Sequence, residues 1–168
     1  MNKTVIFDLD GTLIDSLGDI HTALNDVLQL RNAPPLMLAA VRDLIGKGSA
    51  NLVRRALTAR NLPIDEASCT SALADFLRLY SADSAKLTTI FDGAIDALDR
   101  LQGDGFCLGI CTNKPLAPTK TVLDQFGLTR FFDTIVGGDQ LASRKPDPAM
   151  LFHAMACLGA TSCLFVGD

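Results

Sequence analysis

The chain has 168 residues, of which 48% are apolar, 20% charged and 6% aromatic, and its formal net charge is −4. This length suits one domain, or a core with a small inserted module, and the composition excludes intrinsic disorder. The longest strictly apolar run has six residues, Leu36 to Val41, whereas a membrane-spanning helix needs about twenty. The sequence also lacks a dense basic cluster. We therefore expect neither a membrane nor a nucleic acid as a partner.

The five cysteines, at positions 69, 107, 111, 157 and 163, show no CxxC spacing. An odd number without paired spacing is typical of small buried thiols in a reducing compartment, not of a disulfide framework or a zinc site. The N-terminus leads directly into a short apolar run and lacks the small-residue cleavage pattern of a secretory signal. These features predict a cytoplasmic location.

Four short apolar runs predict β-strands in chain order: Thr4–Phe7, Phe106–Cys111, Thr134–Val136 and Cys163–Val166. None alternates apolar with polar residues, which is typical of strands buried on both faces of a parallel sheet. Segments with helical periodicity and recognisable ends lie around them, at 93–101, 118–126 and 147–159. This alternation predicts an α/β fold with a three-layer, doubly wound, Rossmann-like parallel sheet.

One stretch breaks the alternation, because residues 16–85 contain no strand-like run. Apolar residues recur there at helical spacing in three groups: Leu17, Ile20, Leu24, Val27 and Leu28; Leu52, Val53, Ala56 and Leu57; and Leu73, Phe76, Leu77 and Tyr80. Such a segment is too long for a simple crossover between strands. We therefore predict an α-helical cap over residues 16–85, inserted into a catalytic core formed by residues 1–15 and 86–168.

Polar residues follow each predicted strand, at the end of the sheet where open α/β folds bind ligands. They are Asp8 and Asp10 after the first strand, Thr112 and Asn113 after the second, Gly137-Gly138-Asp139 after the third, Lys145 further along that connection, and Asp168 after the fourth. Neighbouring carboxylates need a cation between them, and oxygen ligands favour a hard ion such as Mg²⁺. A lysine and a hydroxyl at the same edge indicate metal-assisted phosphoryl transfer.

The segment Phe7-Asp8-Leu9-Asp10-Gly11-Thr12-Leu13 resembles the DxDGT signature of the haloacid dehalogenase superfamily of phosphatases. Further motifs of that superfamily follow in order: Thr112-Asn113, Lys145-Pro146-Asp147-Pro148 and Val166-Gly167-Asp168. Within the predicted cap, Ile45-Gly46-Lys47-Gly48 and residues 52–57 are similar to phosphoglycolate phosphatases in particular.

The resemblance implies roles for the reacting groups. Asp8 is expected to be the nucleophile that forms an aspartyl-phosphate. Asp10 is expected to protonate the leaving alkoxide and then to take a proton from the attacking water. Lys145 is expected to offset the charge of Asp8 and of the phosphoryl oxygens. The alternative without a catalytic role is that both aspartates only form a turn after a strand and that the lysine is a solvated surface residue.

The resemblance also implies binding residues. Thr112 and the amide of Asn113 are expected to hold the phosphoryl oxygens. Mg²⁺ is expected to be held by Asp8, the main-chain carbonyl of Asp10, and Asp168. Lys47, between two glycines of the cap, either binds a substrate carboxylate or is only a loop charge.

The leading functional hypothesis is hydrolysis of a small phosphorylated metabolite, 2-phosphoglycolate, by a monomer or homodimer. A sugar phosphomutase of the same superfamily and a phospho-accepting receiver domain are the alternatives. A receiver carries its acceptor aspartate after a central strand in mid-chain, and the helical insertion has no place in it. Because the last apolar run ends two residues before the last residue, we also expect a truncated C-terminus, with a natural protein that continues beyond Asp168.

Overall fold

The computed structural model describes residues 3–82 and 85–167. The chain divides into two compact units, Met1–Asp15 with Thr89–Asp168, and Ser16–Thr88. We call the first the core unit and the second the helical unit.

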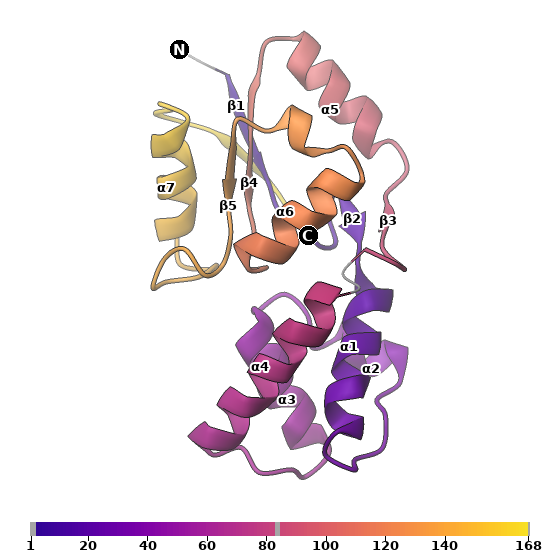
Figure 1. The fold of residues 1–168 in the computed structure, drawn as a ribbon. Helices are drawn as coiled ribbons and strands as arrows, with labels where there is room; N and C mark the ends of the chain where they lie inside the picture. The colour runs from indigo at the N-terminus through magenta and orange to yellow at the C-terminus, as the bar shows by residue number, and fades with distance from the viewer. Residues whose placement is uncertain (1–2, 83–84, 168) are drawn as a thin grey trace. The chain divides into compact units, whose positions relative to one another are not determined.

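The core unit contains a four-stranded sheet in the order β5-β4-β1-β6 (Figure 1). Its strands are β1 (Thr4–Phe7), β4 (Cys107–Cys111), β5 (Thr134–Val136) and β6 (Leu164–Val166). All neighbours are parallel, with Val5 opposite both Leu108 and Leu164. All four predicted strands are present, and their parallel pairing confirms the predicted α/β class.

Helices cover both faces of this sheet, which gives the predicted three layers. Helix α7 (Ala149–Cys157) lies on one face, while α5 (Ala94–Gly103) and α6 (Leu116–Gln125) lie on the other (Figure 1). A short 3-10 helix, η1 (Thr129–Phe131), follows α6. Under α7, Met150 and Ala154 pack with Ile6, Cys111 and Val136, all buried. This packing holds the carboxyl ends of β1, β4 and β5 in a rigid layer.

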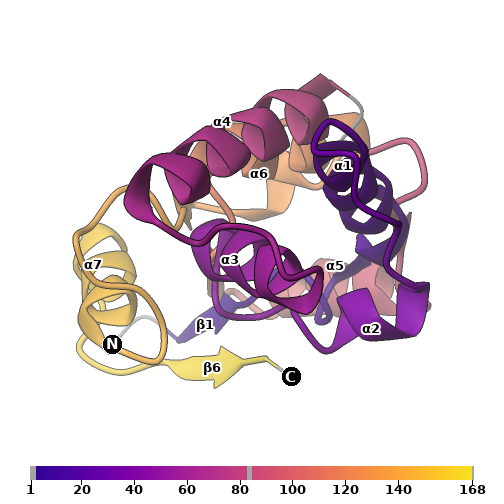
Figure 2. The same cartoon turned by 90° about the horizontal axis from the view of Figure 1, so that it is seen from below.

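The exposure of strand β6 contradicts the expectation that all four strands are buried on both faces. Its residues Leu164, Phe165 and Val166 are 66%, 42% and 41% exposed. In the described part of the sheet β6 has β1 as its one neighbour (Figure 2), so it lies at an edge. An apolar run without alternation therefore predicted the strand correctly but not its burial.

The cysteines are free thiols, but the prediction that they are buried is wrong for Cys157, which is exposed on α7. That helix has one face on the sheet, so a thiol on its other side meets solvent. Cys111 on β4 is fully buried. Within residues 3–82 and 85–167, no helix has the length and apolar character that crossing a membrane requires.

A second, two-stranded sheet was not predicted. Strands β2 (Ile14–Asp15) and β3 (Thr89–Ile90) pair in antiparallel fashion, with Ile14 opposite Ile90. Two residues are too few to show a periodicity. The pair draws together the points where the chain leaves and re-enters the core unit.

The helical unit contains α1 (Leu17–Gln29), α2 (Leu38–Arg42), α3 (Ser49–Ala59) and α4 (Glu66–Ala82) (Figure 2). The predicted apolar faces of α1 and α3 form its core, together with Phe76 and Tyr80 of α4. The rings of Phe76 and Tyr80 stack with centroids 5.5 Å apart. Residues Leu73 and Leu77 are only partly buried against this core, because they lie at its margin.

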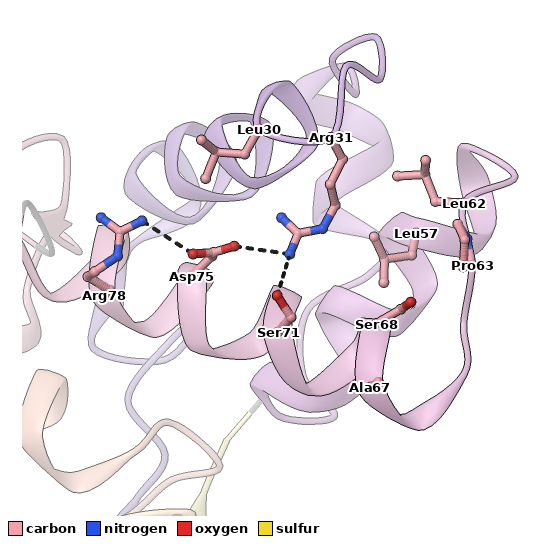
Figure 3. Close-up of a pocket in the computed structure, with 10 residues that line it drawn as sticks. All are labelled: Leu30, Arg31, Leu57, Leu62, Pro63, Ala67, Ser68, Ser71, Asp75 and Arg78. Atoms are coloured by element: carbon pink, nitrogen blue, oxygen red, sulfur yellow. Dashed lines mark hydrogen bonds and ion pairs between the residues drawn. The ribbon is translucent and has the colours of Figure 1, made fainter.

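A groove on the helical unit is lined by α4, by the segment that follows α1, and by the end of α3 with the segment after it (Figure 3). Arg31 and Arg78 both pair with the Asp75 carboxylate, at 3.0 and 3.3 Å. The hydrogen bond from Arg31 lowers the pKa of Asp75. The two pairs join the segment that follows α1 to α4, and two arginines against one aspartate leave one net positive charge in the groove.

Asp19 in the first turn of α1 is buried, at 4% exposure. Its carboxylate accepts hydrogen bonds from the N–H of Leu87 and Thr88, both at 2.8 Å, and from the Thr88 hydroxyl at 2.6 Å. We expect Asp19→Ala to lower the free energy of unfolding by about 3 kcal/mol, because it leaves buried donors without an acceptor. Calorimetry should show a melting temperature lower by roughly 6–12 °C.

Asp96→Ala provides the matched control, since Asp96 also lies in the first turn of a helix but is exposed. It removes the favourable interaction with a helix dipole, worth about 0.3–1 kcal/mol, and no buried hydrogen bonds. Equal melting temperatures for the two variants would contradict the role given to the Asp19 contacts.

Candidate active site

Asp8 directly follows β1 and is held by both backbone and side-chain contacts. Its N–H donates to the carbonyl of Val166 at 2.8 Å, which extends the β1–β6 ladder past the end of the strand. One carboxylate oxygen accepts the N–H of Leu9 at 2.7 Å, and the other lies 2.5 Å from Nζ of Lys145. The two predicted residues therefore meet as a charge-assisted pair.

Lys145 is positioned by Asn113, which follows β4. The Asn113 side chain accepts the N–H of Lys145 at 3.0 Å and donates to its carbonyl at 3.1 Å. The Lys145–Pro146 peptide bond is cis. The Lys145 ammonium also lies 5.2 Å from the ring centroid of Phe165, a favourable cation–π distance. Asn113 after β4 and Phe165 of β6 thus both contact Lys145, whose ammonium lies beside Asp8 after β1.

The loop after β4 is fixed by close backbone contacts. The N–H of Thr112 donates to the carbonyl of Val136 at 3.0 Å, and its hydroxyl accepts the N–H of Lys114 at 3.2 Å. The N–H of Gly138 donates to the carbonyl of Lys114 at 2.8 Å. A Cβ at Gly138 would lie 2.3 Å from the carbonyl oxygen of Asn113, so this approach requires glycine.

Asp10 has a partner that the sequence motifs did not identify. Nζ of Lys114 lies 2.9 Å from one Asp10 carboxylate oxygen. The signal available in the sequence was position alone, since Lys114 directly follows Thr112 and Asn113 at the end of the same strand. A lysine in such a loop is normally read as a solvated charge, which is why its burial was missed.

These contacts join five of the predicted site residues in one network: Asp8, Asp10, Thr112, Asn113 and Lys145. When both carboxyl groups are ionised, Asp8 and Asp10 balance the charges of Lys145 and Lys114. A phosphate monoester dianion would therefore add negative charge that the network alone does not neutralise.

The buried thiol of Cys111 precedes Thr112 but is no candidate nucleophile. Burial raises the pKa of Cys111 to about 11, opposed in part by the Lys145 charge and reinforced by that of Asp8. The thiol is therefore protonated near neutral pH, whereas the thiolate is the reactive form.

The expected metal ligands fall partly outside the described residues. Asp168 is one of the residues that the structure does not describe. Among those it does describe, no group of three or more His, Cys, Asp or Glu side chains could hold a metal ion. The remaining expected donors, the Asp8 carboxylate and the Asp10 carbonyl, are oxygens at the end of one strand. Their chemistry fits a hard divalent cation such as Mg²⁺.

Lys47 lies in the helical unit, in the turn between α2 and α3, and is exposed. Its neighbours Gly46 and Gly48 have φ angles of +102° and +81°, which strongly favour glycine. The turn presents the lysine side chain to solvent.

The paired aspartates and lysines lie at the carboxyl ends of parallel strands, where open α/β folds bind ligands. The model of the haloacid dehalogenase-like hydrolase family matches residues 5–168. The chain belongs to this family. The match confirms the resemblance inferred from the motifs, and with it the prediction of a phosphatase enzyme.

Several relatives carry the name phosphoglycolate phosphatase. The one from Cereibacter sphaeroides (strain ATCC 17029 / ATH 2.4.9) is 42% identical over 164 residues, which span 98% of this chain and 75% of the relative. The one from Rhodospirillum rubrum is 42% identical over 174 residues, covering 100% and 72%. The crystal structure of a predicted phosphoglycolate phosphatase from Haemophilus somnus 129PT superposes with a TM-score of 0.88 at 29% identity, covering 99% of this chain and 77% of that one.

Proposed function

We propose that the chain hydrolyses 2-phosphoglycolate to glycolate and phosphate through an aspartyl-phosphate on Asp8. The observation that carries this proposal is the pairing of Asp8 with Lys145 at 2.5 Å, at the carboxyl end of β1. A carboxylate there can attack phosphorus, and an adjacent ammonium can balance charge on the phosphoryl oxygens. The names of the relatives support the choice of substrate.

In the first half-reaction, a carboxylate oxygen of Asp8 forms a bond to phosphorus while the bond from phosphorus to the glycolate oxygen breaks. Asp10 gives its proton to that leaving oxygen. The Thr112 hydroxyl and the Asn113 N–H hold the transferring oxygens, and Lys145 offsets their charge. In the second half-reaction, Asp10 takes a proton from water as that water attacks phosphorus, which frees phosphate and restores Asp8.

Mg²⁺ would be held by Asp8, the carbonyl of Asp10, and Asp168. When bound, this ion supplies positive charge that neutralises the phosphoryl group and orients it for in-line attack. Removal of the ion with a chelator is therefore expected to stop phosphate release, and added Mg²⁺ is expected to restore it.

Phosphate release from a panel of small phosphorylated metabolites tests the proposal directly. We expect the highest kcat/KM for 2-phosphoglycolate. Movement of phosphate between positions of a sugar, without free phosphate, would identify a phosphomutase instead. A panel without any turnover would contradict the phosphatase proposal altogether.

Lys47 is proposed to bind the substrate carboxylate. The exposed ammonium forms no ion pair within the described residues. We expect Lys47→Ala to raise KM for 2-phosphoglycolate about tenfold, the scale of one charge-assisted hydrogen bond, and to leave KM for ethyl phosphate nearly unchanged. Arg54→Ala, which removes another exposed cation of the helical unit, is the matched control. If Lys47→Ala changed KM equally for both substrates, Lys47 would be only a surface charge.

A further inference from the structure

Lys114 and Lys145 each pair with one aspartate of the site, but they differ in access to solvent. The side chain of Lys145 is 18% exposed and that of Asp8 is 20% exposed. The side chain of Lys114 is 3% exposed, whereas that of Asp10 is 17% exposed. A molecule arriving from solvent can therefore reach Lys145 and both carboxylates. The Lys114 side chain is almost completely shielded from solvent.

The backbone of Lys114 is also held on both sides. Its N–H donates to the Thr112 hydroxyl, and its carbonyl accepts the N–H of Gly138 and lies 3.5 Å from the hydroxyl of Thr119. These contacts come from the loops after β4 and β5 and from α6. The backbone of Lys114 is therefore held in place, and its buried side chain reaches Asp10 from a fixed position.

We propose that Lys114 is a positioning residue that sets the orientation of the Asp10 carboxyl group; this inference rests on the phosphatase function proposed above. The ammonium donates to one carboxylate oxygen of Asp10 at 2.9 Å, and this contact sets how the carboxyl group is turned. As the Asp10 proton passes to the leaving oxygen, the negative charge left on Asp10 is stabilised by Lys114. In this proposal Lys145 offsets the charge of the phosphoryl group, and Lys114 positions the acid Asp10.

This assignment has a specific kinetic consequence. A leaving group that is a strong base, such as the alkoxide of glycolate, needs the proton from Asp10 as the phosphorus–oxygen bond breaks. A nitrophenolate leaves without it. Misplacement of a reacting group by about 1 Å can lower a rate about 10²-fold. Loss of Lys114 is therefore expected to slow alkyl phosphates selectively.

The test compares Lys114→Met with wild type on 2-phosphoglycolate and on p-nitrophenyl phosphate. We expect kcat/KM to fall roughly 10- to 100-fold for the first and less than about threefold for the second. Lys120→Met, which removes an exposed lysine of α6, should change neither value. A structural defect would lower kcat/KM equally for both substrates, and that result would overturn the proposal. If Lys114→Met does not fold, Lys114→Gln is measured by the same criteria.

A double-mutant cycle with Asp10→Asn completes the test. If Lys114 acts through Asp10, the double variant should be no slower on 2-phosphoglycolate than Asp10→Asn alone. Multiplicative losses would overturn the proposal. Selective loss in Asp10→Asn without selective loss in Lys114→Met would refute the role of Lys114 and leave the phosphatase function standing. A wild-type chain inactive on both substrates would refute the two together.

Discussion

Asp8→Asn is expected to lower kcat for phosphate release by about 10⁴- to 10⁶-fold, the scale on which loss of a nucleophile acts in other enzymes. An amide is a far weaker nucleophile than a carboxylate toward phosphorus, and it carries no charge to hold a cation. The pair with Lys145 at 2.5 Å is lost at the same time. Steady-state phosphate release and acid-quenched trapping of a phosphorylated protein should both report the loss.

The effect should be chemical and not structural. Asp8 and Lys145 are each about one fifth exposed, so an unpaired lysine can be hydrated and the fold should survive. Asp104→Asn removes an exposed carboxylate of the core unit and should retain wild-type activity. If Asp8→Asn still formed a phosphorylated protein at the wild-type rate, the nucleophile would have to be another residue.

Asp10→Asn should have the second largest effect, with a fall of about 10²- to 10⁴-fold in kcat for 2-phosphoglycolate. The amide can neither protonate the leaving oxygen nor take a proton from water. With p-nitrophenyl phosphate the first half-reaction needs little help, so the phosphorylated protein should accumulate. Rapid mixing should then show a burst of nitrophenolate close to one equivalent per active site, followed by slow turnover.

This pattern separates an acid from a residue that only supports the site. Asp10→Asn also removes the negative charge that pairs with Lys114, so the variant is compared with Lys114→Met, which keeps the carboxylate. Only the loss of Asp10 should block the second half-reaction strongly. Equal slowing of both half-reactions for good and poor leaving groups would argue against Asp10 as the acid and base.

Much of the fold could be predicted because its signals are local. Apolar runs without alternation mark β1, β4 and β5, and helical spacing from Leu17 to Leu28 marks α1 and its buried face. The same locality explains the failures. The exposure of β6 depends on tertiary packing, since β5 at the other edge of the described sheet is far more buried, and the β2–β3 pair joins segments far apart in the chain.

The candidate site divides in the same way. The order of residues along the chain shows which chemical groups follow each strand, and the geometry of parallel sheets brings strand ends to one edge. Five residues could therefore be placed together: Asp8, Asp10, Thr112, Asn113 and Lys145. Which lysine meets which aspartate could not be read from that order and is seen in the folded chain. That choice depends on burial and on backbone contacts such as Gly138 against Asn113. Those contacts join residues distant in the chain, so no local pattern carries them.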